Sequence, residues 1–416
     1  MSMRWVLLVL PCLFFATPVL GANPPLWPQW RGPQRNGFAE GGPWPSTLET
    51  LNVAWTAADL GESYSGPIVG EKLVYTTATV DKKREVVRAL ERASGREVWR
   101  AEWDGAMTVP FFAARNGSWI RATPALSDGV LYVAGMRDVL VALDAETGKE
   151  LWRVDFPKET GSPLPTFGFV SSPLVVQEAI FVQAGGALVK LDKKTGKRLW
   201  TVLEDGGGMM HSAFSSPVLT TLAGTPQLLV QTRSLLAGVD PDTGTVYWKR
   251  PIPAFRGMNI LTPQPAFGGI FTSTYGGTTQ WFPVAESAGK WSTGEGWSLR
   301  YEGYMTSPVL LGDHAYLLGK DQRAICVDLK RGKECWRTDR RFGQYWSLVT
   351  DGEKLLALDQ RGRLLLFRAN PQEFEVLAER DLGSGETWAH LAVCGHEVFV
   401  RDLTGLTCYH WGKPSK

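Results

Sequence analysis

The chain has 416 residues, of which 44% are hydrophobic and 21% are charged, so it can bury a sizeable core. Its 44 lysines and arginines nearly balance its 42 aspartates and glutamates, which leaves a net charge of +2. This balance gives no electrostatic reason to expect a nucleic acid or an anionic membrane surface as a partner.

The first residues form a segment of a different kind. Arg4 precedes the apolar run 5–16, and the small residues Gly21 and Ala22 follow it. The run is shorter than the roughly 20 apolar residues that span a membrane, and it is typical of a secretory signal peptide. We therefore expect residues 1–22 to be a signal peptide and the mature protein to be exported, periplasmic or secreted, soluble, monomeric and without a membrane span.

A turn motif recurs along the rest of the chain. Five stretches of eleven residues share an acidic residue, three residues, Gly, three residues and Trp; they occupy 89–99, 142–152, 190–200, 238–248 and 326–336. In the three most regular copies the acidic residue, Gly and Trp are Asp144, Gly148 and Trp152; Asp192, Gly196 and Trp200; and Asp240, Gly244 and Trp248. The acidic side chain is expected to cap a β-hairpin turn, Gly to supply a positive φ, and Trp to pack from the returning strand.

A second signal has the same period. Two small residues precede Pro and an apolar strand at Pro67, Pro124, Pro173, Pro217, Pro265 and Pro308, and two relatives without Pro are centred on Leu348 and Leu391. The seven steps from Pro67 to Leu391 average about 46 residues, close to the length of a propeller blade. The sequence therefore predicts an all-β fold, an eight-bladed propeller of four-stranded antiparallel blades over residues 52–412, after an N-terminal arm at 23–51.

Ring closure follows from the ends of the repeat. The last unit stops at 406–411 without an outer strand, while the unpaired strand 52–55 precedes the first unit. We expect this N-terminal strand to complete blade eight. Trp55 would then take the repeated tryptophan position. Trp291 would take it in a shortened copy of the turn at 284–291.

The starts of the inner strands predict a binding surface. The residues three positions before each Pro position should gather at one mouth of the channel, together with Trp346 and His390, and the long connections 101–120 and 154–168 arrive at the same face. These residues are Tyr64, Arg121, Val170, Phe214, Thr262, Met305, Tyr345 and Trp388. Aromatic side chains and Arg are frequent at binding hot spots, although the same side chains could instead fill the channel.

The cysteines leave one question open. Cys326 and Cys335 flank the sixth turn at the positions of Ala142 and Leu151, which we expect to face each other across the hairpin. A cross-strand disulfide and two small strand residues are both compatible with this placement. Cys394 and Cys408 are expected to be free thiols, and no spacing of Cys or His predicts a metal site.

The turn at 144–152 and 192–200 resembles the repeat of pyrroloquinoline-quinone (PQQ) type propellers, and the resemblance covers almost the whole mature chain. The opening 27–33 resembles the N-terminal signature of exported PQQ-like propellers without assigned activity. The related branches are the quinoprotein dehydrogenases and the non-enzymatic lipoprotein that scaffolds outer-membrane β-barrel assembly. This lipoprotein carries an anchor cysteine, which Pro11 argues against at Cys12.

The resemblance to the dehydrogenases implies groups that the sequence lacks. Those enzymes hold PQQ against a disulfide of two adjacent cysteines, coordinate Ca²⁺ through Glu and Asn, and use an Asp as base. No adjacent cysteines occur here, and the inner-strand starts carry no carboxylate. We therefore expect no catalytic residues and no cofactor, and a scaffold that binds an unidentified envelope protein or a small ligand. A PQQ- and calcium-dependent dehydrogenase and a carbohydrate-binding propeller remain the alternatives.

Overall fold

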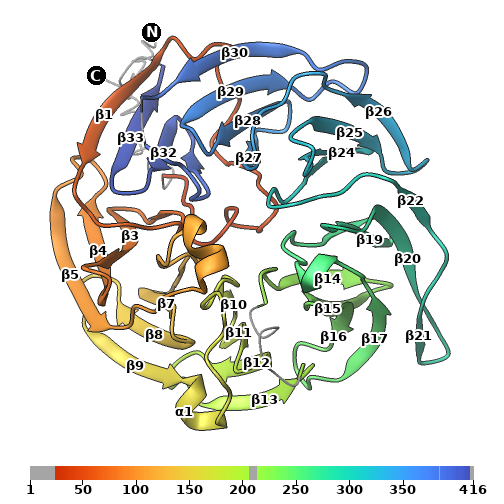
Figure 1. The fold of residues 1–416 in the computed structure, drawn as a ribbon, viewed down its shortest axis with the longest axis horizontal. Coiled ribbons are helices and arrows are strands. Elements are labelled where there is room, and N and C mark those ends of the chain that lie inside the picture. Colours follow the sequence, from red (N-terminus) through yellow and green to blue (C-terminus); the bar gives the residue numbers. More distant parts are fainter. Residues whose placement is uncertain (1–23, 206–212, 384, 413–416) are drawn as a thin grey trace, which may run out of the picture.

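Eight antiparallel sheets surround a central channel in the computed structural model, which describes residues 24–205, 213–383 and 385–412 (Figure 1). The predicted eight-bladed propeller is therefore confirmed. The expected signal peptide lies outside the described residues. In the part of the chain that the structure describes, none of the helices has the length and apolar character needed to cross a membrane.

Each sheet begins at the channel and ends at the rim, in chain order for seven of the eight blades. Blade one consists of β2 (Ile68–Val69), β3 (Leu73–Val80), β4 (Arg84–Glu91) and β5 (Glu97–Asp104), and blade two of β6 (Ala125–Ser127), β7 (Val130–Gly135), β8 (Val139–Asp144) and β9 (Glu150–Asp155). Blade three consists of β10 (Leu174–Val176), β11 (Ala179–Ala184), β12 (Ala187–Asp192) and β13 (Arg198–Val202), and blade four of β14 (Val218–Leu222), β15 (Thr225–Gln231), β16 (Leu235–Val239) and β17 (Val246–Pro251).

The remaining blades follow the same plan, with one additional strand in blade five. Blade five consists of β18 (Gln264–Ala266), β19 (Gly269–Ser273), β20 (Thr279–Ser287), β21 (Lys290–Thr293) and β22 (Trp297–Leu299), and blade six of β23 (Val309–Leu311), β24 (His314–Leu318), β25 (Ala324–Asp328) and β26 (Lys333–Arg337). Blade seven consists of β27 (Trp346–Thr350), β28 (Lys354–Asp359), β29 (Arg363–Arg368) and β30 (Val376–Asp381), and blade eight of β31 (Ala392–Cys394), β32 (Glu397–Arg401), β33 (Leu406–Trp411) and β1 (Leu51–Ala57). Short helices are η1 (Phe111–Asn116), α1 (Phe156–Thr160) and η2 (Phe255–Gly257).

The N-terminal strand closes the ring, as predicted. β1 pairs antiparallel with β33 and forms the outer strand of blade eight. Closure removes the free edge that β33 would otherwise present. Trp55 is 7% exposed, and its indole N–H donates to the Arg92 carbonyl oxygen in blade one at 2.8 Å.

The recurring turn joins neighbouring blades. Asp144 Oδ1 accepts the backbone N–H of Thr147 at 2.8 Å, and Gly148 has φ 72°. A Cβ atom at Gly148 would lie 2.5 Å from the Trp99 ring, so the Trp of one blade packs onto the turn glycine of the next blade. Trp99 Nε1 donates to the Ala145 carbonyl oxygen at 3.0 Å, which fixes the same joint.

Blades four and five depart from the expected pattern. Trp248 donates to Gln227 Oε1 of its own blade at 2.8 Å instead of to the next turn. In blade five the contact with the next turn comes from Trp297 on β22, which donates to the Leu329 carbonyl oxygen at 2.8 Å. The prediction that Trp291 takes this position is wrong, because Trp291 lies on β21 at the end of an extended β20–β21 hairpin and stacks on Tyr247.

The register expected for the sixth turn differs by one residue in the structure, although the thiols of Cys326 and Cys335 lie close to each other. A β-bulge follows each cross-strand pair, so Ala142 lies opposite Trp152 and Cys326 lies opposite Trp336, while Leu151 and Cys335 have no partner residue directly opposite. Cys326, Cys335, Cys394 and Cys408 are all free thiols. Burial, and then the proximity of Cys335, raises the pKa of Cys326 above the usual thiol range.

Candidate functional site

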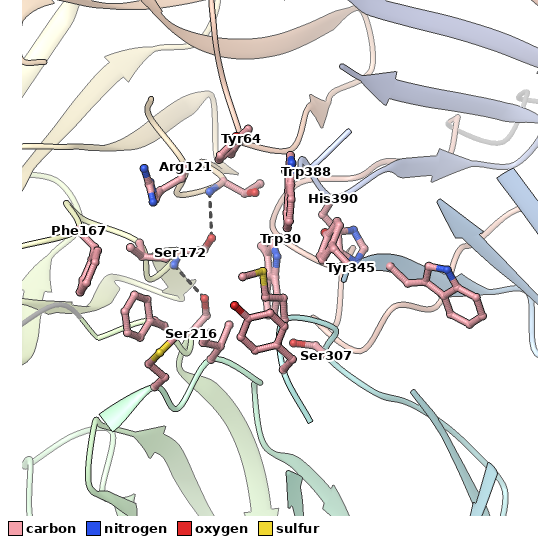
Figure 2. Close-up of a pocket in the computed structure, with 18 residues that line it drawn as sticks. Trp30, Tyr64, Arg121, Phe167, Ser172, Ser216, Ser307, Tyr345, Trp388 and His390 are labelled. Atoms are coloured by element: carbon pink, nitrogen blue, oxygen red, sulfur yellow. Dashed lines mark hydrogen bonds between the residues drawn. The ribbon is translucent and has the colours of Figure 1, made fainter. Parts of the chain in front are cut away.

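A cavity of about 240 Å³ opens at one mouth of the channel. Tyr64, Arg121, Val170, Phe214, Met305, Tyr345 and Trp388 all line it, as do Trp346 and His390. Figure 2 shows Tyr64, Arg121 and Trp388 together around the hollow. The repeat register therefore brings together residues that lie up to 326 positions apart in the chain.

One member of the predicted set lies elsewhere. Thr262 does not line the cavity, and Ile260 takes the corresponding place in blade five. β18 begins directly after Pro263, as β10 begins directly after Pro173, so Pro263 and not Pro265 is the equivalent proline. The doubled proline at 263 and 265 caused this two-residue error.

Aromatic rings form one side of the mouth. Trp388 stacks on Tyr345, with ring centres 5.8 Å apart and an interplanar angle of 22°. The ring of Trp388 also contacts that of Tyr64, with centres 5.9 Å apart. The Arg121 guanidinium lies 5.9 Å from the centre of the Tyr64 ring, a cation–π distance. Three adjacent blades thus present neighbouring aromatic rings to the cavity, two of them stacked and the third tilted.

Trp346 and His390 line the cavity but are buried. Trp346 is 2% exposed and packs 4.7 Å from Phe342 in the core between blades, so much of its ring stabilises the fold. The His390 Nδ1 is 2.9 Å from the Leu391 carbonyl oxygen, to which the ring donates. Burial, followed by the charge of Arg31, lowers the pKa of His390 to about 3, so the ring is neutral at pH 7.

The N-terminal arm closes the other end of the channel. Trp27 exchanges two backbone hydrogen bonds with Val69 at the end of β2, and Ala39 and Gly37 bond to Thr350 at the end of β27. These contacts lie at the far ends of inner strands whose beginnings carry the cavity residues. The arm, red in Figure 1, enters the middle of the ring, and its Trp30 lines the cavity.

Two arginines of the arm are buried beneath this surface. Arg31 donates to the carbonyl oxygens of Asn36 (3.0 Å) and Pro308, and Arg35 donates to those of Pro173 (2.7 Å) and Ser172 (3.0 Å). Their side chains are 0% and 2% exposed. Sequence analysis identified the arm but not its role in the site, because nothing in residues 24–51 carries the repeat.

A series of hydroxyl groups runs beside the channel from blade one to blade six. The backbone N–H of Gly66 donates to Thr123 Oγ1 at 3.0 Å, that of Thr123 to Ser172 Oγ at 3.0 Å, and that of Ser172 to Ser216 Oγ at 2.9 Å. The series continues from Ser216 to Thr262 and from Thr262 to Ser307. These are the small residues before each proline, so the repeat signal contained them, although the sequence did not show what they bond.

The long connections lie on the mouth side, next to the cavity. Phe111 on η1 is 91% exposed and Phe112 is 52% exposed. Phe112 contacts Phe167 at 6.3 Å, and Phe167 contacts Phe214 at 5.6 Å, so a row of rings leads from the surface to the cavity.

The residues present do not fit a calcium-bound quinone. Ca²⁺ takes six to eight oxygen ligands and usually several carboxylates, whereas no Asp or Glu lines the described part of the cavity. Glu386 lies near enough to Tyr64 to raise the pKa of its hydroxyl group, but Glu386 itself is solvent-exposed and does not line the cavity. The adjacent cysteines of the dehydrogenases are missing from the sequence.

One group of metal-ligand type occurs away from the cavity. Glu397, Cys408 and His410 on β32 and β33 hold ligand atoms within 4.8 Å of one another. The Glu397 carboxylate already pairs with Arg92 of blade one, whose Nε lies 2.9 Å from Oε2. This group therefore joins blade eight to blade one.

Comparison with known proteins agrees with the propeller and with the repeat. The eight-bladed fold with its recurring turn is that of a PQQ-like propeller, and the family model described as outer membrane protein assembly factor BamB matches residues 83–338, more than half of the chain. The chain belongs to this family.

The individual relatives fall into two groups. The outer membrane protein assembly factor BamB of Shewanella oneidensis is 24% identical over 295 residues, which cover 66% of this chain and 71% of that protein. A 1-butanol dehydrogenase (cytochrome c) of Thauera butanivorans is 39% identical over 195 residues, 44% of this chain but only 25% of the enzyme. The quinohemoprotein alcohol dehydrogenase of Comamonas testosteroni shares the fold, with 15% identity, a TM-score of 0.66, and coverage of 96% of this chain and 82% of that chain.

Proposed function

We propose that the protein is a non-catalytic propeller that serves as a binding scaffold in the cell envelope, with the channel mouth as its working surface. The observation that carries the proposal is the composition of this surface: aromatic and arginine side chains without a carboxylate in the cavity wall. General base chemistry on an alcohol needs a carboxylate or another base within reach of the hydroxyl. Binding needs only shape, apolar area and hydrogen-bond donors.

The exposed rings of η1 favour a protein as one partner. Phe111 is 91% exposed on a short helix beside the cavity, and large exposed apolar side chains that adjoin a hollow are typical of interaction sites. The relatives named as assembly factors of outer membrane proteins support a partner in the envelope. An exported, monomeric chain that binds neither nucleic acid nor membrane completes the proposal.

Site-specific photo-crosslinking tests the scaffold role. A photoreactive residue at Phe111 is expected to capture a defined envelope protein, whereas the same residue at Leu199, which is 51% exposed on the outer strand β13, is the matched control. The captured protein is then purified and titrated with the wild-type chain and with the Phe111→Ser/Phe112→Ser variant. Equal binding by the two, or equal capture from position 199, would contradict the proposed surface.

A second measurement tests the proposed absence of catalysis. The chain is incubated with PQQ and Ca²⁺, and dye-linked oxidation of ethanol and 1-butanol is recorded. We expect no oxidation above that of the cofactor alone. Oxidation that requires the protein and disappears on chelation of calcium would establish the dehydrogenase alternative.

A further inference from the structure

Blade eight carries a cluster of side chains with the donor atoms that bind transition metals. Glu397 on β32 lies directly opposite His410 on β33, and Cys408, two residues before His410, points to the same face of the sheet (β32 and β33, blue in Figure 1). A carboxylate oxygen, a thiol sulfur and an imidazole nitrogen thereby come within 4.8 Å of one another. The cluster lies at the end of the blade away from the channel mouth, where the carbonyl oxygen of Glu40 in the arm accepts the backbone N–H of Gly395.

The donor atoms suit zinc in kind and in spacing. Zn²⁺ takes Cys, His and carboxylate ligands at about 2.0–2.3 Å in a tetrahedral arrangement, which sets neighbouring donors about 3.3–3.7 Å apart. His410 Nε2 and Glu397 Oε1 are 3.8 Å apart, which is too far for a hydrogen bond and near this spacing. The Cys408 sulfur lies within 4.8 Å of both, so side-chain rotations that move the donors by about 1 Å would bring all three around one ion.

The carboxylate is already oriented for this role. Glu397 Oε2 accepts from Nε of Arg92 at 2.9 Å and from its Nη2, which leaves Oε1 turned toward His410. Arg92 is itself fixed, since it donates to the carbonyl oxygens of Gly70 (2.8 Å) and Pro25 (3.1 Å). Hydrogen bonds of this kind, from partners outside the ligand set, orient metal-binding carboxylates. Metal binding at Oε1 would therefore keep the link between blades eight and one.

The three groups differ in exposure, and this difference provides a path for the ion. Cys408 is 0% exposed, whereas the side chains of Glu397 and His410 are 23% and 44% exposed. An ion would enter from the His410 side, and water would take the fourth position there. Cys408 would bind as the thiolate, and together with the carboxylate it would offset the two positive charges of the ion, which reduces the cost of burying the cation.

We propose that Glu397, Cys408 and His410 form a zinc site that stabilises the closure of the ring. The N-terminal strand β1 pairs with β33, and Glu397 links the β32–β33 hairpin to blade one, so an ion bound across this hairpin would stiffen the joint at which the ring closes. The spacing of Cys408 and His410 did not indicate this site, because the Glu397 ligand comes from the neighbouring strand. The inference goes beyond the proposed function, which concerns the opposite face of the ring.

Metal titration of the full chain, without an affinity tag and stripped of metal by a chelator, tests the site. Co²⁺ is the spectroscopic probe. We expect one equivalent to bind with the visible bands of a tetrahedral ion and a near-ultraviolet thiolate charge-transfer band, and Zn²⁺ to displace it with a dissociation constant of about 1 μM or tighter. Mg²⁺ should not compete, because it prefers oxygen ligands. The melting temperature should rise with the zinc concentration, since an ion that binds the native state stabilises it.

Variants assign the ion to these side chains. Cys408→Ser should abolish the charge-transfer band. His410→Gln should weaken zinc binding by more than about tenfold, the least that loss even of an outer hydrogen-bond partner usually costs. Cys335→Ser and His314→Gln are the matched controls, because both residues are half-buried in blade six, on β26 and β24, and these variants should bind zinc as the wild type does. Circular dichroism establishes that each variant is folded.

Four results would overturn the inference: no charge-transfer band in the folded wild-type chain, zinc binding by His410→Gln equal to that of the wild type, an equal loss of binding in the control variants, or a melting temperature that does not respond to zinc. The outcome is separable from that of the scaffold test, because the two measurements share no residue. Capture of a partner from position 111 without zinc binding would refute the metal site and leave the proposed function standing. Zinc binding without a protein partner would do the reverse.

Discussion

Closure of the ring by Trp55 gives the most direct test of the architecture. Trp55→Ala removes a ring that is 93% buried between blades eight and one, together with its hydrogen bond to the Arg92 carbonyl oxygen. Loss of a buried Trp side chain costs about 3–5 kcal/mol, and the lost hydrogen bond contributes roughly 1 kcal/mol of that free energy. β1 would still be held by its backbone ladder with β33 and by the buried side chain of Leu51, but it would lose its side-chain bond to blade one.

Guanidinium unfolding and limited proteolysis measure the effect. Trp55→Ala should lower the denaturation midpoint clearly and expose the arm and β1 to cleavage, whereas Trp55→Phe should lie between the variant and the wild type. Val53→Ala is the control on the same strand, because Val53 is 57% exposed and its loss should change stability by no more than about 0.5 kcal/mol. If Trp55→Ala unfolds at the same midpoint as Val53→Ala, Trp55 does not stabilise the closure.

Three further predictions concern the turn, the channel and the thiols. Gly148→Ala should destabilise the protein by about 1–3 kcal/mol more than Gly129→Ala. Both positions have a positive φ, but only at Gly148 would the new Cβ atom meet a ring, that of Trp99, at 2.5 Å. Equal melting temperatures of the two variants would contradict this prediction. His390→Asn keeps a donor toward the Leu391 carbonyl oxygen but cannot be protonated. The unfolded chain takes up a proton at His390 below about pH 6.5, and the folded chain does so only near pH 3, so wild-type stability is lost as the pH falls through this range. The wild type should lose about 2 kcal/mol more than the variant between pH 7 and pH 4.5, and equal losses in melting experiments at the two pH values would refute the assignment. Thiol counting under denaturing conditions without reductant should find Cys326, Cys335, Cys394 and Cys408 all free, and two missing thiols would establish the disulfide.

The sequence alone determined the blade count, the order of the strands and the closing strand, because each follows from a local pattern that recurs. The acidic residue, Gly and Trp of the turn form contacts within a few residues or with the next repeat, so a period of about 46 residues predicts where those contacts lie. The same register placed Tyr64, Arg121, Phe214, Tyr345 and Trp388 around one mouth. It failed at Thr262, where two prolines offered two registers, and at Trp291, where an extended hairpin moved the packing Trp to residue 297.

The tertiary structure alone decided what lies beneath that mouth. Residues 24–51 have no repeat, and the arm is positioned by backbone bonds to the ends of inner strands from several blades, such as those of Trp27 to Val69 and of Ala39 to Thr350. These partners are distant in the chain, and backbone groups carry no residue identity that a sequence could display. For this reason the buried charges of Arg31 and Arg35, and the Trp30 ring above them, became part of the site only when the fold brought the arm into the channel.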